Sequence, residues 1–418
     1  MSGAAGGMRF GANYTPSEGW FHSWYDLDLD AVARDMGSLA ALGLDHVRIF
    51  PLWETLQPNR TLIRDRAVAD VVSVVDVAHE HGLGTSVDVL QGHLSSFDFL
   101  PSWVLSWHRR NIFADEAVVE AQERLVTALG SALTGRPGFL GLTLGNETNQ
   151  FGKAIHPDRQ ALGPQVAGRW LERLLTAAHD CAPGRVHSHS FDDDVWFVDS
   201  SGVTPEHAAG IGDVTTVHSW VFTGVARHFP PDHPAHTWFA RYLLELAAAW
   251  GGPDRPLWLQ EVGAPVPHLG ADRVPDFARE TLRRAVARPG LWGVTWWCSH
   301  DVDRSLADFP ELEYSLGLLA ADRSVKPLGA AVRDVLPELR ELATRTPAPA
   351  AEVWELPTDD AGRVVRSASA PGSPLFAAWV EAAEAGTPPR FALPAGAVSL
   401  VTCAAGAGTT AATVGATA

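Results

Sequence analysis

Short runs of residues that favour β structure alternate with long amphipathic stretches over residues 1–345. The runs are five to eight residues long and end in polar or aromatic residues, which is typical of buried strands followed by loops. Eight of them are predicted to be strands: Arg9–Asn13, His46–Pro51, Gly84–Leu90, Phe139–Asn146, Arg185–Ser190, Asp213–His218, Leu257–Glu261 and Gly293–Cys298.

The stretches between these runs are rich in Ala, Leu and Arg and are predicted to be helices. They are Leu29–Leu42, Arg66–His81, Glu116–Thr134, Pro164–Cys181, Thr237–Trp250, Asp276–Arg288 and a closing helix at Pro327–Thr344. Eight strands that alternate with helices predict an α/β fold, a (β/α)8 TIM barrel over residues 1–345. The alternative is an open doubly wound sheet. That fold usually has a Gly-rich phosphate turn after its first strand, and none follows Asn13.

The pattern changes after the barrel. Residues 347–351 read as a linker, and residues 352–403 contain β-inclined segments (VVRSA, PLFAAWV, AVSLVT) separated by glycine turns. We predict a small β-rich appendage there. Residues 404–418 are rich in Gly, Ala and Thr and are predicted to form a flexible tail.

Composition narrows the class of protein. The chain has 418 residues, of which 46% are hydrophobic, and a formal net charge of −17, which argues against a nucleic-acid partner. Its three cysteines are too widely spaced for a disulfide framework or a zinc knuckle. The N-terminus lacks the features of a secretion signal, and no apolar stretch is long enough to span a membrane. We therefore expect a cytoplasmic protein, whose oligomeric state the sequence leaves open.

Two of the predicted strands end in a glutamate. The fourth reads GFLGLTLGNETNQ and its apolar run stops at Asn146–Glu147, whereas the seventh reads PLWLQEVG and ends in Glu261. Active sites of such barrels lie at the carboxyl ends of the strands, and these two strands face each other. We expect both side chains to meet in one pocket, with the pKa of Glu147 raised by partial burial.

A pair of carboxylates has a specific use in glycoside hydrolysis. One protonated carboxylic acid donates to the leaving oxygen, and one carboxylate lies below the anomeric carbon. A separation of about 5–5.5 Å leads to a covalent intermediate and retention of configuration. We predict that Glu147 is the acid/base and Glu261 the nucleophile. The other interpretation, two strand-end charges solvated by loops, is less favoured because both follow apolar strands.

The chain resembles the clan A glycoside hydrolases over roughly residues 8–340, and family five most closely. Members of the clan carry Asn-Glu at the end of strand four, matching Asn146–Glu147, and a second Glu at the end of strand seven, matching Glu261. Family five adds an Arg on strand two, matching Arg48 in HVRIF, and a His on strand six, matching His218 in TTVHSW. It also has an aromatic platform on strand eight, in the region of VTWWCSHD.

The chain departs from the family at two positions. Trp220 stands where the family often has a Tyr two residues after the strand-six His, and Thr148 replaces the usual Pro after the strand-four Glu. An indole N–H donates a hydrogen bond as a phenol does, but from a different point. These departures affect the subfamily more than the chemistry.

The resemblance implies roles for the residues around the two glutamates. Arg48 would keep the nucleophile ionised, because an adjacent guanidinium lowers a carboxylate pKa by about one to three units; a core ion pair has the same geometry. Asn146 would bind the sugar hydroxyl next to the anomeric carbon, unless it only caps a turn. Trp297 shares a strand face with Ser299 and Asp301, so we expect it, and not Trp296, to be the sugar platform.

Loops after the second and third strands offer further candidates for binding sugar hydroxyls. Trp53 and Glu54 follow strand two, and Gln91 and His93 follow strand three. The alternative for each of them is ordinary loop polarity.

The main rival is a metal-dependent barrel hydrolase. His187 and His189 form an H-S-H motif on one face of the fifth strand, and imidazoles bind zinc. Such enzymes are expected to place paired histidines on strand one, where this chain reads GANY. We therefore expect no metal and no cofactor. A sugar-binding pseudoenzyme would need Glu147 or Glu261 replaced, and both are present.

Within family five, the chain is most similar to cytoplasmic β-mannosidases that act on short mannosyl oligosaccharides such as Man-β-1,4-GlcNAc. The long aromatic loops Gln91–Phe113 and Val221–His236 predict a walled, exo-acting pocket. We thus predict an exo-acting β-mannosidase with an oligosaccharide substrate. A β-glucosidase, a β-galactosidase and an endo-β-mannanase of the same clan remain open.

Overall fold

A computed structural model describes residues 7–199, 201–345 and 352–403. Its centre is a parallel sheet of seven strands in the order β6-β3-β2-β1-β9-β8-β7. The strands are β1 (Arg9–Asn13), β2 (His46–Ile49), β3 (Gly84–Asp88), β6 (Phe139–Thr143), β7 (Thr215–Ser219), β8 (Leu257–Val262) and β9 (Leu291–Trp296). These strands confirm seven of the eight predicted ones. They could be predicted because buried parallel strands have nearly continuous apolar sequences.

The fifth predicted strand, Arg185–Ser190, is not a regular strand, and this part of the prediction is wrong. The segment nevertheless lies along β6, where the N–H groups of Val186 and Ser188 donate to the carbonyls of Leu140 and Leu142, each at 2.9 Å. On the β7 side, the hydroxyl of Thr216 replaces a backbone donor and bonds to the carbonyl of His189 at 2.8 Å. The segment thus closes the (β/α)8 barrel without a regular ladder on both edges.

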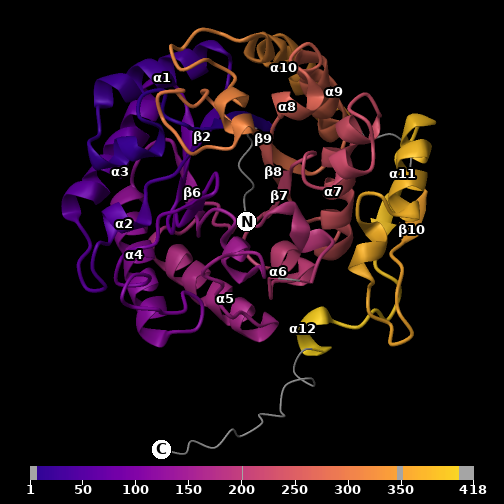
Figure 1. Ribbon diagram of the computed structural model, residues 1–418, viewed down its shortest axis with the longest axis horizontal. Helices are drawn as coiled ribbons and strands as arrows, with labels where there is room; N and C mark the ends of the chain where they lie inside the picture. Colours follow the sequence, from indigo (N-terminus) through magenta and orange to yellow (C-terminus); the bar gives the residue numbers. More distant parts are fainter. Residues whose placement is uncertain (1–6, 200, 346–351, 404–418) are drawn as a thin grey trace, which may run out of the picture.

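Helices surround the sheet, as Figure 1 shows. The long ones are α1 (Leu29–Ala41), α3 (Asp65–Glu80), α4 (Glu116–Leu133), α5 (Pro164–Cys181), α7 (Ala235–Gly251), α9 (Val274–Val286) and α10 (Pro327–Thr344). The short ones are α2 (Trp53–Leu56), α6 (Pro205–Gly210) and α8 (Val266–Leu269). Within the described residues, no helix is both long and apolar enough to cross a membrane. The seven long helices begin and end within a few residues of their predicted bounds, because each has one apolar face against the sheet.

Short elements in the loops at the carboxyl ends of the strands wall the barrel mouth. They are the hairpin β4 (His93–Leu94) and β5 (Phe97–Asp98), and the 3-10 turns η2 (Thr148–Gly152), η3 (Asp193–Trp196), η4 (Val225–Arg227) and η5 (Glu311–Ser315). A further 3-10 turn, η1 (Trp20–Tyr25), follows β1. The two turn residues of the hairpin, Ser95 and Ser96, have φ values of 48° and 72°. Such values favour Gly or Asn, so packing around the hairpin must hold this turn in place.

The C-terminal segment departs from its prediction. It contains β10 (Val353–Glu355) paired in parallel with β11 (Arg390–Ala392), η6 (Arg366–Ser369), α11 (Pro374–Glu384) and α12 (Leu400–Cys403). The β interpretation of PLFAAWV is wrong, since these residues lie in α11. Ser373 caps that helix by accepting from the Phe376 N–H at 3.1 Å, and Pro374 occupies its first turn.

This segment packs against the barrel at α7 (Figure 1). The ring of Tyr242 in α7 lies 4.8 Å from Phe376 and 5.1 Å from Trp379, measured between ring centroids. The hydroxyl of Tyr242 donates to the carbonyl of Ser369 at 2.6 Å. The predicted linker at 347–351 and the predicted tail at 404–418 lie outside the described residues.

Candidate active site

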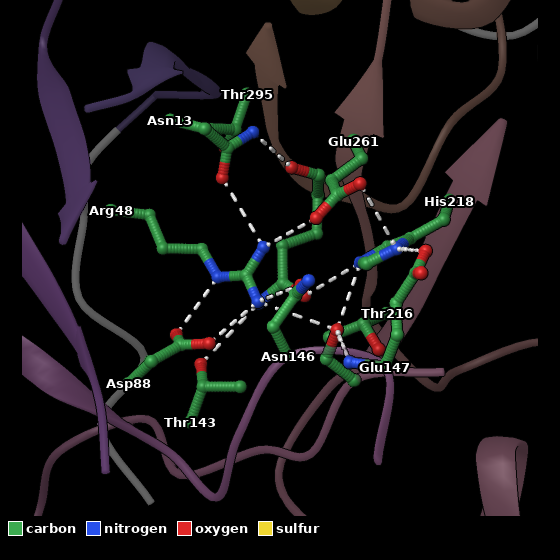
Figure 2. Close-up of polar contacts among 12 residues, drawn as sticks. Asn13, Arg48, Asp88, Thr143, Asn146, Glu147, Thr216, His218, Glu261 and Thr295 are labelled. Carbon is green, nitrogen blue, oxygen red and sulfur yellow. Dashed lines mark hydrogen bonds and ion pairs between the residues drawn. The ribbon is translucent and has the colours of Figure 1, made fainter. Parts of the chain in front are cut away.

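Arg48, at the end of β2, is fully buried and organises the centre of the barrel mouth (Figure 2). Its Nε and Nη2 donate to the two oxygens of Asp88 at 2.9 and 2.7 Å. Its Nη1 donates to Glu261 Oε1 at 2.9 Å, and Nη2 also donates to Asn146 Oδ1 at 2.9 Å. A buried guanidinium needs such partners to offset its desolvation. Burial lowers the pKa of Arg48, but the charges of Asp88 and Glu261 outweigh burial and raise it.

Glu261 lies on β8, and its side chain is also buried. Oε1 receives the bond from Arg48, and Oε2 accepts from the indole N–H of Trp220 at 3.2 Å. Trp220, which stands where the family often has a Tyr, thus donates to this carboxylate through its indole N–H. Burial raises the pKa of Glu261 to about 7 and the charge of Glu147 adds to the rise, while His218 and Arg48 oppose it. Arg48 lowers the pKa of Glu261, as expected, but it does not hold this pKa low, because burial and the charge of Glu147 outweigh Arg48 and His218.

Glu147 directly precedes η2 and has a left-handed backbone, with φ at 42°. Its Oε1 lies 2.7 Å from His218 Nδ1, and its Oε2 accepts from Gln150 Nε2 at 3.1 Å. Burial raises the pKa of Glu147, but the hydrogen bond and charge of His218 outweigh burial and lower it to about 2. The prediction that the pKa of Glu147 is raised is therefore wrong, since it considered burial and not the contact with His218.

His218, on β7, bridges the two glutamates. Its Nδ1 lies 2.7 Å from Glu147 Oε1 and 3.3 Å from Glu261 Oε2, while its Nε2 faces Gln260 Oε1 at 3.2 Å. Both ring nitrogens therefore face acceptors, which favours the protonated imidazolium. Burial lowers the pKa of His218, but the charge of Glu261 and the bond to Glu147 raise it overall. The two carboxylates thus share a positive group between them.

The two glutamates meet as predicted. One oxygen of Glu147, one oxygen of Glu261 and a ring nitrogen of His218 all lie within 4.8 Å of one another. Inverting glycosidases keep their carboxyl groups about 6.5–9.5 Å apart to admit a water, whereas retaining enzymes hold them at about 5–5.5 Å. The separation in this protein therefore fits a retaining pair.

A cavity of about 550 Å³ opens onto the two glutamates. Trp297, Trp220, His93 and Asn146 line it, as expected for substrate-binding residues. Trp297 is 4% exposed and its ring lies 5.6 Å from that of Phe50. The cavity is walled by the β4–β5 hairpin, by η5 and by Ala370 and Pro371 of the C-terminal segment. Loops therefore wall the cavity, as the loop lengths predicted.

Other predicted residues lie elsewhere. Glu54 is outside the cavity lining and accepts a hydrogen bond from the Tyr25 hydroxyl, so the structure does not bring it to the glutamates. Trp53 is buried and bonds to Gln57. Gln91 is buried and donates to the His93 carbonyl at 2.6 Å, which supports the hairpin rather than the cavity.

The two histidines of the metal rival face backbone groups. His187 Nε2 lies 2.8 Å from the Ala182 carbonyl, and His189 Nε2 lies 3.2 Å from the His207 carbonyl. Among the described residues, two groups of three side chains are close enough to share a cation: His93, Asp98 and His156, and the two glutamates with His218. Neither group contains His187 or His189, so the H-S-H motif is a set of hydrogen-bonded core groups.

Sequence reasoning missed several contacts of the site. Asp88, the buried counter-ion of Arg48, is a charged residue within the apolar third predicted strand and ends β3, and its place there was a usable signal. Ser190 lies 2.9 Å from His218 Nε2 and ends the fifth predicted strand. Gln150 and Glu313 lie in 3-10 turns of the loops, where no periodic pattern marks them.

Comparisons with known proteins give one consistent answer. No family model and no curated sequence matches the chain. Among solved structures, a GH5_18 protein from Streptomyces cattleya, crystallised as a Glu-to-Ala variant with Manβ1-4GlcNAc, is 52% identical, with 93% of this chain and 94% of that chain covered and a TM-score of 0.88. A GH5_18 protein from Bifidobacterium longum subsp. longum, in complex with the same disaccharide, is 44% identical, with 93% and 91% covered and a TM-score of 0.89.

Proposed function

The chain belongs to glycoside hydrolase family 5, in clan A, and from this premise we propose that it is a retaining, exo-acting β-mannosidase that releases single mannose units from short β-mannosyl oligosaccharides. The observation that carries the proposal is the pair of buried glutamates, with oxygens within 4.8 Å, in a cavity walled by loops. The choice of a mannoside rests on the two relatives that bind Manβ1-4GlcNAc.

The proposed first step uses the two glutamates together. A carboxylate oxygen of Glu261 attacks the anomeric carbon while Glu147 donates a proton to the leaving oxygen, which forms a glycosyl-enzyme ester and frees the leaving sugar. Arg48 holds Oε1 of Glu261, which leaves Oε2, near His218 and Trp220, as the attacking atom. In the second step Glu147 removes a proton from water, which displaces Glu261 from the sugar.

We propose that His218 holds the proton that Glu147 needs for the first step. The reaction needs an ionised Glu261 and one proton on Glu147, and the 2.7 Å bond lets a proton pass between His218 Nδ1 and Glu147 Oε1. In the free protein this proton rests on His218, as its two acceptors require. We infer that Glu147 receives it when a substrate oxygen approaches.

Substrate-binding roles follow from the lining of the cavity. We propose that Trp297 stacks against the C–H face of the bound mannose and that Asn146 binds the hydroxyl next to the anomeric carbon. Asn146 is held for this by Arg48, whose Nη2 donates to its carbonyl oxygen. His93 and Trp220 complete the lining around the sugar.

We also propose a cytoplasmic location, where the enzyme would meet short imported oligosaccharides. A cavity walled by loops suits a short substrate better than a polymer. Activity assays on the cytosolic, membrane and external fractions of the source cells test this directly, and activity confined to the external fraction would overturn it.

A panel of aryl β-glycosides tests the proposed function. We expect the β-mannoside to be hydrolysed fastest, with β-mannose as the first-formed product in a proton NMR time course. Activity should persist in EDTA. Faster turnover of a β-glucoside or β-galactoside would replace the sugar assignment, and α-mannose as the first product would overturn retention.

Chain-length analysis tests the exo assignment separately. With mannopentaose as the substrate, an exo enzyme releases mannose and mannotetraose first. Mannobiose and mannotriose as the early products would show an endo enzyme with an open cleft.

A further inference from the structure

A third carboxylate lines the cavity beside the two glutamates. Glu313 belongs to η5, in the loop that follows β9, and shares the lining with Ser95, Trp297 and Glu261. Its backbone N–H donates to the Pro310 carbonyl at 3.0 Å, which fixes the turn. The mechanism proposed above gives this side chain no task.

Glu313 has no basic partner, unlike the acidic residues near it. In the same loop Glu311 pairs with Arg304 and Asp301 pairs with Lys326, each at 2.6 Å. Within the parts of the chain that the structure describes, no ion pair includes Glu313. Burial raises its pKa to about 7, the charge of Glu261 adds to the rise, and its neighbours Ser95 and Trp297, both neutral donors, oppose it.

Glu313 is partly exposed to the cavity, and a carboxylate that is even partly removed from water is costly unless donors satisfy it. Each carboxylate has two oxygens and about four acceptor sites, so two neutral neighbours leave acceptor capacity free. Among the described residues, no basic side chain supplies a charged donor to Glu313. Hydroxyl groups on neighbouring carbons of a sugar carry the donors that match two carboxylate oxygens.

The position of Glu313 places it on the side of the glycone, the sugar that is cleaved off. It shares the cavity lining with Trp297, the proposed platform, and with the hairpin turn at Ser95 and Ser96. Because Trp297 is proposed to stack against the glycone, we place Glu313 on the same side of the cavity.

The wall at this end of the cavity is continuous. Phe309, in the same loop as Glu313, packs with its ring 4.8 Å from Phe97 of the β4–β5 hairpin and 4.7 Å from Trp20 of η1. The hairpin turn at Ser95 and Ser96 lines the cavity at the same place. Three loops thus meet beyond the sugar and leave a carboxylate facing inward.

We propose that Glu313 is a substrate-binding residue that accepts hydrogen bonds from hydroxyls of the terminal sugar, on the side of the ring away from the cleaved bond. This inference rests on the proposed function and deepens it. Together with the wall, Glu313 makes the cavity specific for the end of a chain, because a further sugar attached there would remove a hydroxyl donor and meet the wall.

The test compares Glu313→Gln and Glu313→Ala with the wild-type enzyme on the aryl β-glycoside that the wild type hydrolyses fastest. The same assays use monodeoxy derivatives that each lack one hydroxyl of the sugar. We expect kcat/KM to fall about 10- to 100-fold on the parent glycoside, since hydrogen bonds to a charged group are lost. On the derivative that lacks the hydroxyl bound by Glu313, the loss should nearly vanish.

Two controls keep the result specific. Glu311→Gln changes the same turn, but Glu311 is exposed and paired with Arg304, so its kcat/KM should match the wild type on every derivative. A change of leaving group should not alter the relative loss in the Glu313 variants. An equal loss on all derivatives, or no loss on the parent, would overturn the inference. A different preferred sugar would instead overturn the proposed mannoside and leave this test valid.

Discussion

The centre of the site and its walls are built in different ways. The centre lies at strand ends, where Arg48 from β2 contacts Glu261 from β8 and His218 from β7 contacts both glutamates. The walls lie on the β4–β5 hairpin, on η5 and on the C-terminal segment. Strand ends are held by the sheet on both sides, whereas loops vary without disturbing it. We therefore expect the strand ends of the barrel to carry out the reaction and the loops to select the substrate.

This difference predicts two kinds of variant. A substitution at the centre should reduce the hydrolysis of every substrate, because it removes a group that acts on the reacting bond. A substitution in the wall should reduce hydrolysis only for substrates that use the lost contact.

The largest effect is expected at the proposed nucleophile. Glu261→Ala should lower kcat on every aryl glycoside by about 10⁴-fold or more, because no covalent intermediate can form. Added azide should restore turnover as an α-glycosyl azide, which NMR identifies. Glu54→Ala is a suitable control, since Glu54 bonds to Tyr25 outside the cavity and its loss should leave activity unchanged. Rescue that yields the β-azide would assign Glu261 the other role.

Loss of the acid should depend on the leaving group. Glu147→Ala should turn over glycosides of strongly acidic phenols nearly normally in the first step, because such leaving groups need no proton. Oligosaccharides and alkyl glycosides should be hydrolysed extremely slowly. Azide should rescue this variant as the β-glycosyl azide. A loss that is uniform across the leaving-group series would contradict the assignment of Glu147 as the acid.

Trp297 lies between the two regions, at a strand end but in the cavity lining. Trp297→Ala should reduce kcat/KM by roughly one to three orders of magnitude, equivalent to about 1–4 kcal/mol of transition-state binding. Trp107→Ala serves as the matched control, because that indole is fully exposed. Equal kinetics in the two variants would show that Trp297 is not a sugar platform.

The pH dependence should report the centre rather than the walls. Glu261 must be ionised to attack, and its pKa is raised to about 7, so kcat/KM should fall as the pH drops below about 7, by up to tenfold per unit. On the alkaline side, activity should fall when the proton shared by His218 and Glu147 is lost. A profile that stays flat down to pH values near the ordinary pKa of glutamate would contradict the raised pKa.

The sequence predicted the centre better than the walls. Glu147 and Glu261 were predicted from the strand pattern, because each ends an apolar run that the sequence identifies as a strand. Arg48 and His218 were identified through the resemblance to family five, which matches them to an Arg on strand two and a His on strand six. The pKa shifts were not predictable, since they depend on which third group each carboxylate meets. The pKa of Glu147 was expected to rise through burial, but the bond to His218 lowers it instead.

Two parts of the walls, η5 and the C-terminal segment, were not predicted, for another reason. Glu313 lies in a 3-10 turn that has no buried residue of its own, so no hydrophobic pattern marks it. The C-terminal helix α11 read as a strand because PLFAAWV is almost uniformly apolar, and a short apolar run does not distinguish a buried helix from a strand. Its contribution to the cavity, through Ala370 and Pro371, depends on packing against α7 that sequence spacing does not encode.

The central claim is that Glu261 attacks the sugar, and trapping the covalent intermediate tests it most directly. A 2-deoxy-2-fluoro-mannosyl fluoride slows both steps and lets the glycosyl-enzyme accumulate, and peptide mass spectrometry then locates the added sugar. The account predicts one fluoromannosyl group per chain, attached to Glu261 and absent from the Glu261→Ala variant. A label on Glu147 or on any other residue, or inactivation without a covalent adduct, would contradict it.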